Sequence, residues 1–118
     1  MSERAYKLVD SGEWRRALDD GAYAGSAVDL ADGYIHMSTG AQLAETARRH
    51  FPGRTDLLLV AVDLARVEPA LKWEPSRGGE LFPHLYGPLP TAAAVEVRRL
   101  LVDEAGVMRF EDGKIGWP

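Results

Sequence analysis

Short segments with the apolar patterns of β-strands recur along the chain. Residues 6–9 are β-prone and are followed by the polar residues 10–12, and residues 57–62 form the most continuous apolar run. This run is too short for a typical helix and indicates a strand that is covered on both faces. Residues 71–74 alternate as a further short strand. The pattern therefore predicts a sheet with residues 57–62 at its centre.

Two segments in the N-terminal half space their apolar residues as helices do. The first begins at residues 10–12 and ends at Gly21, a residue type that readily adopts the left-handed conformation of a helix C-terminus. The second begins at Thr39, which forms a Thr-x-x-Gln capping box with Gln42. It ends at residues 51–53, Phe-Pro-Gly. We therefore expect two helices, both before the central strand.

The remaining segments contain turn residues and further strand patterns. Residues 21–33 are rich in Gly, Ser, Ala and Asp with little periodicity, which predicts a loop long enough to cover a ligand. Residues 82–88 contain two prolines, which restrict them to an edge strand or an ordered loop. Residues 94–102 and 107–110 predict two strands that are joined by a turn at residues 103–106.

The length and composition fit one small domain over residues 1–118. A chain of 118 residues buries one hydrophobic core and is short for two domains. Apolar residues make up 46% and charged residues 27%, as in ordinary folded proteins. We therefore predict an α+β fold, with two helices early, strands late and a mostly antiparallel sheet.

Charge, cysteine content and the N-terminal sequence exclude several classes of function. A net charge of −4 gives no electrostatic footprint for a polyanion, so we expect no nucleic-acid partner. The chain has no cysteine, which excludes disulfides, thiolate metal sites and a cysteine nucleophile. The N-terminus is polar and leads into no apolar segment of signal or membrane-spanning length, so we expect a cytoplasmic protein without a membrane partner.

The densest group of functional side chains lies in residues 32–39. Strand alternation places His36 on the face opposite its apolar neighbours. His36 is a candidate catalytic residue because an imidazole ordinarily titrates near physiological pH; alternatively, it is a histidine hydrogen-bonded within the sheet. Ser38 and Thr39 are candidate ligand-binding residues beside a helix N-terminus, which suits an anionic group, although the capping box alone explains Thr39.

A second group of functional side chains follows in residues 82–88. His84 and Tyr86 project to the same side of an extended segment that flanking prolines stiffen; alternatively, they fill the core. Glu74 ends the preceding strand and would stabilise a developing cation or polarise a ribose hydroxyl, unless it is a plain surface residue. We expect His36 and His84 to face each other across one cleft.

Other kinds of site fit the sequence less well. A zinc site formed by the histidines and Glu74 lacks the spacing of a known metal motif, so we expect no metal ligands. The chain contains no Gly-x-Ser-x-Gly motif, P-loop or Gly-x-Gly-x-x-Gly motif. His50, near the end of the second helix, is assigned to the solvent side and is left out of the site.

In combination, several motifs of this chain resemble the small bacterial domain-of-unknown-function family 952. They are residues 32–39, Gln42-Leu43, residues 71–74 and residues 82–89. The resemblance extends over nearly the whole chain, from residue 6 to the final strands. The fold of this family is similar to that of ADP-ribosyltransferases, which implies a split, curved sheet that holds NAD in its cleft.

The resemblance implies a cleft that binds NAD or a related nucleotide and an activity that transfers or hydrolyses its ADP-ribose. In that scheme the candidate catalytic residues are His36, Glu74 and His84, and the candidate cofactor-binding residues are Ser38, Thr39 and Tyr86. Lys7 stands in the first strand, where such enzymes have His or Arg.

Two alternatives to an enzyme remain open at this point. The first is a non-catalytic module that binds a nucleotide, a sugar phosphate or a peptide in the same groove. The second is a protein-interaction domain whose exposed anchors are Trp14, Trp73 and Trp117.

Overall fold

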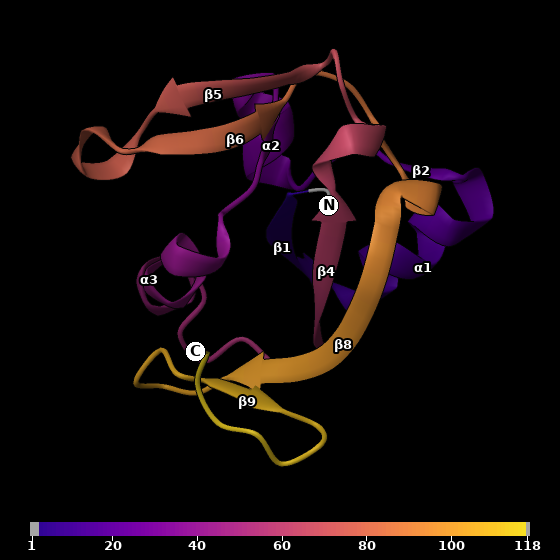
Figure 1. Cartoon of the computed structure of the whole chain (residues 1–118). Coiled ribbons are helices and arrows are strands. Elements are labelled where there is room, and N and C mark those ends of the chain that lie inside the picture. The colour runs from indigo at the N-terminus through magenta and orange to yellow at the C-terminus, as the bar shows by residue number, and fades with distance from the viewer. Residues whose placement is uncertain (1–2, 118) are drawn as a thin grey trace.

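Three antiparallel sheets form the framework of residues 3–117, the part of the chain that the computed structural model describes (Figure 1). The largest sheet has the order β1-β4-β8-β9 and consists of β1 (Arg4–Asp10), β4 (Leu57–Asp63), β8 (Ala94–Val102) and β9 (Met108–Phe110). The second has the order β3-β6-β5 and consists of β3 (Ile35–His36), β5 (Leu71–Pro75) and β6 (Leu81–Leu85). The third pairs β2 (Ala22–Tyr23) with β7 (Leu89–Pro90). The predicted α+β class and antiparallel sheet are confirmed.

The α-helices all precede β4 in the chain. They are α1 (Ser11–Asp20), α2 (Ala27–Asp32) and α3 (Gly40–His50). Three short 3-10 helices, η1 (Leu64–Arg66), η2 (Arg77–Gly79) and η3 (Thr91–Ala93), connect the later strands. Within residues 3–117, no helix has both the length and the apolar character needed to cross a membrane.

The two predicted helices begin and end where their local signals indicate. The side chain of Asp10 accepts a hydrogen bond from the backbone N–H of Glu13 at the start of α1, and Gly21 ends this helix with a φ of 82°. The predicted capping box between Thr39 and Gln42 begins α3. These ends are fixed by side chains within one turn of the helix, which is why the sequence alone predicts them.

The prediction of a loop for residues 21–33 is wrong, because this segment contains β2 and α2. A second capping box explains the extra helix: Ser26 accepts from the N–H of Asp29, whose side chain accepts from the N–H of Ser26. The apolar residues Val28 and Leu30 of α2 are exposed, so the helix has no apolar stripe for a periodicity argument to detect.

Strand β4 lies between β1 and β8 and is covered on both faces, as its continuous apolar sequence predicts. On one face Val60 and Val62 are buried in a cluster with Trp14 of α1. On the other face Leu59 is buried in a cluster with Leu43 of α3. Because alternate residues of a strand point to opposite faces, α1 and α3 pack on opposite faces of the largest sheet.

Strand β6 is the central strand of its sheet, so the prediction of an edge strand or loop is wrong for residues 82–85. The carbonyl of Pro83 accepts from the N–H of Met37 at 3.1 Å. The backbone nitrogen and oxygen of one strand residue point toward the same neighbouring strand, so the nitrogen of Pro83 points toward β3. Strand β3 pairs with β6 only through residues 35 and 36. The missing N–H of Pro83 therefore falls where the ladder has ended.

The two larger sheets are joined through Ser38, two residues after the end of β3. Its N–H donates to the carbonyl of Tyr6 at 2.9 Å, and the N–H of Tyr6 donates to the carbonyl of Ser38 at 2.7 Å. This bridge connects β1 to the segment that carries His36. The largest sheet thereby lies against the three-stranded sheet, and the candidate site forms where the two meet.

Candidate functional site

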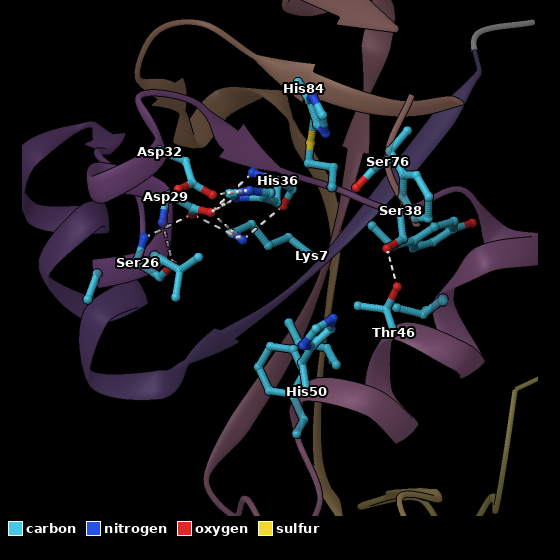
Figure 2. A pocket seen from close by; sticks show the side chains of 18 of the residues that line it. Lys7, Ser26, Asp29, Asp32, His36, Ser38, Thr46, His50, Ser76 and His84 are labelled. Carbon is cyan, nitrogen blue, oxygen red and sulfur yellow. Dashed lines mark hydrogen bonds and ion pairs between the residues drawn. The ribbon is translucent and has the colours of Figure 1, made fainter. Parts of the chain in front are cut away.

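A cavity of about 620 Å³ lies at the junction of the two sheets. Its lining comes from β1, α1, β2, α2, β3, α3, the segment after α3, the turn after β5, and β6. Of the predicted site residues, His36, Ser38 and His84 line it (Figure 2). Within residues 3–117, Thr39, Glu74 and Tyr86 are not among the lining residues. The two candidate groups therefore meet in one cavity, but only part of each group reaches it.

His36 and His84 are direct partners in the pairing of β3 with β6, so they lie side by side on one sheet and the prediction that they face each other across a cleft is wrong. Their ring centroids are 5.6 Å apart. The ring of Tyr34 packs against both, with centroid distances of 4.5 Å to His36 and 4.2 Å to His84. Tyr34 was not among the predicted site residues, although strand alternation places it on the same side as His36. Tyr34 provides an aromatic support that restricts both imidazoles.

His84 is 3% exposed and is held by a carboxylate from the neighbouring strand. Its Nδ1 lies 2.8 Å from Oε1 of Glu74, and the hydroxyl of Tyr86 donates to the same oxygen at 2.8 Å. The hydrogen bonds from His84 and Tyr86 lower the pKa of Glu74 below its ordinary value. An ionised Glu74 accepts a hydrogen bond from Nδ1–H, which fixes Nε2 as the acceptor nitrogen of the neutral ring.

The Nε2 atom of His84 is open to the cavity. Among residues 3–117 no group forms a hydrogen bond with it, and no polar side-chain atom that is sealed from solvent lacks a partner. Because the residue is nearly buried and lines the cavity, the access of Nε2 to solvent is through the cavity. His84 can therefore exchange a proton with a bound ligand.

His36 is held by two carboxylates of α2. Its Nδ1 lies 2.7 Å from Oδ1 of Asp29, and its Nε2 lies 2.9 Å from Oδ2 of Asp32. Only a doubly protonated imidazolium donates to both carboxylates at once. Figure 2 shows the ring next to both aspartate side chains, with dashed lines marking the interactions. Both nitrogens are occupied, so in this arrangement His36 anchors α2 at the wall of the cavity.

Asp29 is the centre of a buried polar network that the sequence analysis missed. It is 2% exposed and forms an ion pair with Lys7 at 3.1 Å. Burial opposes ionisation, but the hydrogen bond from His36, the charge of Lys7 and the N–H groups of Ser26 and His36 outweigh it and hold the pKa of Asp29 well below its ordinary value. Burial also lowers the pKa of Lys7, against the attraction of Asp29. The capping box at Ser26 was the available sequence signal.

Ser38 and Thr39, which are neighbours in the sequence, have different roles. Ser38 is buried and its hydroxyl lies 2.8 Å from that of Thr46 at the cavity wall. The hydroxyl of Thr39 accepts the N–H of Gln42 in the capping box of α3. Ser38 is therefore the hydroxyl that a ligand can reach, and Thr39 is accounted for by the helix.

His50 is exposed, as predicted, and its side chain also lines the cavity. Burial lowers the pKa of His50, and the positive charges of Arg77, Arg49 and His36 lower it further. The approach of Arg77 is tertiary, since it lies in η2 between β5 and β6, and no pattern around His50 predicts it.

Two further arrangements bear on the alternatives. Within residues 3–117 no three His, Asp or Glu side chains converge in a way that would hold a metal ion. Trp14 is buried in the core, and Trp117 packs on Tyr6 and donates to the carbonyl of Gly40. Of the three tryptophans proposed as exposed anchors, Trp73 alone is classed as exposed in the described part of the chain.

The chain matches known proteins over most of its length. The model of a family described as a protein of unknown function, DUF952, matches residues 8–97. The crystal structure of protein CC0527 from Caulobacter crescentus is 45% identical, with a TM-score of 0.85, and the match covers 90% of this chain and 93% of that chain. The solution NMR structure of CC0527 is 46% identical, with a TM-score of 0.76, and the match covers 87% and 89%.

No curated protein matches the chain. The family match covers well over half of the 118 residues. The chain therefore belongs to the DUF952 family.

Proposed function

We propose that this DUF952 protein binds NAD or a related nucleotide in the cavity and cleaves the bond between the base and the ribose, so that ADP-ribose is transferred or hydrolysed. The observation that carries the proposal is the hydrogen-bonded pair of Glu74 and His84, in which the histidine lines the cavity and its Nε2 has no hydrogen-bond partner among residues 3–117. The volume of about 620 Å³ is in the range of sites that enclose a small organic ligand.

The arrangement of the sheets supports an ADP-ribosyltransferase-like fold as part of this proposal. Such a fold holds its ligand in the gap of a split sheet, and here the cavity lies at the junction of the four-stranded and three-stranded sheets. The bridge between Tyr6 and Ser38 fixes this junction. A ligand in the cavity therefore contacts both sheets.

In the proposed reaction His84 is the general base. The bond between C1′ of the ribose and the nicotinamide nitrogen breaks, and its electron pair leaves with the nicotinamide. The oxygen of a water molecule or acceptor hydroxyl adds to the oxocarbenium ion at C1′, and its proton goes to Nε2 of His84. Glu74, hydrogen-bonded to Nδ1, stabilises the imidazolium that forms. Glu74 is a positioning residue because it does not line the cavity.

The distribution of polar groups fits the two ends of the nicotinamide riboside. The carboxylates of Asp10 and Glu13 line the cavity beside α1, and because their hydrogen-bond partners are neutral, their negative charge favours the positively charged ring of oxidised NAD. The hydroxyls of Ser38 and Thr46 lie together at the wall formed by α3 and are suited to hydrogen bonds with ribose hydroxyls.

The direct test is the release of nicotinamide from NAD by the purified protein, followed by chromatography. We expect time-dependent release from the wild type and a loss of about 10²- to 10⁴-fold in His84→Gln, the usual contribution of a general acid or base. Leu101→Ala, at an exposed position of β8 remote from the lining, is the control for handling. No release from the wild type, or undiminished release from His84→Gln, would contradict the proposal.

The second candidate is a non-catalytic module that binds a nucleotide in the same cavity. The observation that favours it is the engagement of both ring nitrogens of His36, which leaves one of the candidate catalytic residues with a structural role. A ligand at a hundred times its Kd stabilises a protein by about 2.7 kcal/mol, which a thermal-shift assay detects. Stabilisation by NAD without nicotinamide release would identify the binding module.

A further inference from the structure

Two arginines from distant segments line the cavity without a counterion. Arg54 follows α3, and Arg77 begins η2 in the turn between β5 and β6. Within residues 3–117 neither guanidinium forms an ion pair or a hydrogen bond. Most other arginines of the chain do form ion pairs: Arg4, Arg48, Arg49, Arg66, Arg98, Arg99 and Arg109. The cavity therefore has arginine donors that the protein itself does not use.

Aromatic rings of the cavity wall support both guanidinium groups. Cζ of Arg77 lies 4.9 Å from the ring centroid of Phe82, and Cζ of Arg54 lies 5.6 Å from that of Phe51. Both phenylalanines also line the cavity. A guanidinium that rests on a ring keeps its N–H donors at its edges, where they can form paired hydrogen bonds to phosphate oxygens.

His50 adds a third potential donor. It lines the same cavity, and no hydrogen-bond partner is recorded for its ring in the described part of the chain. Figure 2 shows His50 on α3 without a dashed line to any neighbour. Beyond the effect of burial, the charges of Arg77, Arg49 and His36 lower its pKa, so the field at this side chain is positive.

The carboxylates of the cavity already have partners elsewhere. Asp10 accepts from a backbone N–H of α1, Glu13 from the phenol of Tyr23, and Asp29 and Asp32 from His36. These acids belong to α2 and to the start of α1, whereas the two arginines flank α3 and the β5–β6 turn. In Figure 1, α3 and this turn lie on the left of the molecule, α1 lies on the right and α2 lies at the top. The cavity is thus polarised.

We infer that Arg54, Arg77 and His50 form a binding site for the phosphate or diphosphate group of the ligand. Paired donors of arginine and an imidazole match the geometry and charge of such a group. The inference rests on the proposed function for its natural occupant, because the diphosphate of a dinucleotide would lie here while the base and ribose reach His84. Recognition of the anion itself does not require catalysis.

The test uses inorganic pyrophosphate as the probe, with affinity measured by isothermal titration calorimetry. We expect saturable binding to the wild type and an affinity reduced at least tenfold in Arg77→Gln and in Arg54→Gln. Arg15→Gln is the matched control, because Arg15 is exposed on α1 and does not line the cavity. Absence of saturable binding, or an equal loss in the Arg15→Gln control, would overturn the inference.

A second measurement follows the ring protons of His50 by NMR during a pH titration. We expect pyrophosphate to raise the pKa of His50, because the bound anion offsets the repulsion from Arg77 and Arg49. An unchanged titration curve at saturating pyrophosphate would place the anion elsewhere and overturn the assignment.

The outcomes for the anion site and for the proposed function are separable. Pyrophosphate binding that depends on the arginines, without nicotinamide release from NAD, would reject the catalytic function and support the anion site. Nicotinamide release with an unchanged KM for NAD in both arginine variants would reject the anion site and support the catalytic function.

Discussion

Nδ1 of His84 lies 2.8 Å from Oε1 of Glu74, on the neighbouring strand β5. The Glu74 carboxylate contacts Nδ1 of the imidazole and does not line the cavity, so it can affect a bound ligand only by changing the orientation or charge of His84. Glu74 was selected from the sequence as a group that would act on the substrate directly. The geometry instead supports a role in orienting His84 and stabilising its protonated form.

Replacement of Glu74 by glutamine should therefore affect turnover more than binding. We expect Glu74→Gln to lower kcat for nicotinamide release on the order of 10²-fold with little change in KM, because a neutral amide does not stabilise an imidazolium. Glu68→Gln is the matched control at an exposed position. Steady-state kinetics on both variants measure the effect, and a rise in KM at constant kcat would show that Glu74 contacts the substrate.

The hydrogen bond from Tyr86 to Glu74 should set the acid limb of the activity profile. This bond and the one from His84 lower the pKa of Glu74, so Tyr86→Phe should raise that pKa. A protonated Glu74 carries no negative charge and no longer stabilises the imidazolium of His84 through the hydrogen bond from Nδ1–H. We therefore expect the acid limb of kcat/KM against pH to move to higher pH in Tyr86→Phe, and an unmoved limb would exclude this link.

Signals that lie within one element were readable from the sequence. The capping box of Thr39 and Gln42 predicted the start of α3, and the continuous apolar run predicted β4 as a strand covered on both faces. Alternation also placed His36 on the polar side of its strand, and it placed His84 and Tyr86 on one side of theirs. The two histidines do reach one cavity, but as side-by-side partners in adjacent strands of one sheet and not across a cleft. In each case the physical cause is local periodicity or a bond within a few residues.

Features set by tertiary contacts were not readable. The burial of Asp29 depends on Lys7, 22 positions away, and α2 presents its apolar residues to solvent. Strand β6 can be central although Pro83 has no N–H, because the pairing with β3 ends before the position where this N–H would be needed. No pattern around Pro83 shows where β3 ends. His50 lines the cavity because the β5–β6 turn brings Arg77 near the end of α3.

Removal of the hydroxyl should have different effects at Ser38 and at Thr39. Thr39→Ala deletes the N-cap of α3 and should cost about 1 kcal/mol of unfolding free energy without changing the affinity for NAD. Ser38→Ala removes a hydroxyl from the cavity wall and should weaken NAD binding. Urea unfolding and calorimetric titration of both variants measure the two effects. An equal loss of NAD affinity in the two variants would show that Thr39 also contacts the ligand.

Removal of the charge of Asp29 should be strongly destabilising. Asp29→Asn leaves Lys7 and His36 without the carboxylate that pairs with both, and the loss of one partner of a buried pair costs about 3–5 kcal/mol. Asp32→Asn is the matched control, because the Asp32 side chain is 48% exposed and its pair with His36 should contribute less than about 1 kcal/mol. Chemical unfolding at neutral pH compares them.

The same carboxylate predicts the direction of acid sensitivity. The pKa of Asp29 is lowered in the folded protein from an ordinary value of 3.8, so its stabilisation is present above that value and is lost as the pH falls through the folded pKa. The difference in stability between wild type and Asp29→Asn should therefore shrink as the pH falls below about 4. A difference that stays constant would show that the effect of the substitution is steric.

The backbone bridge between Tyr6 and Ser38 holds together the two sheets that line the cavity, so the cavity exists only while both sheets are folded and in contact. The cavity is lined by residues of both sheets. We expect the two N–H groups of the bridge to exchange with solvent only when the two sheets separate. A ligand bound in the cavity would contact both sheets and would raise the free energy needed to separate them. The amide protons of Tyr6 and Ser38 should then exchange with deuterium together, and at a rate that falls as the ligand concentration rises.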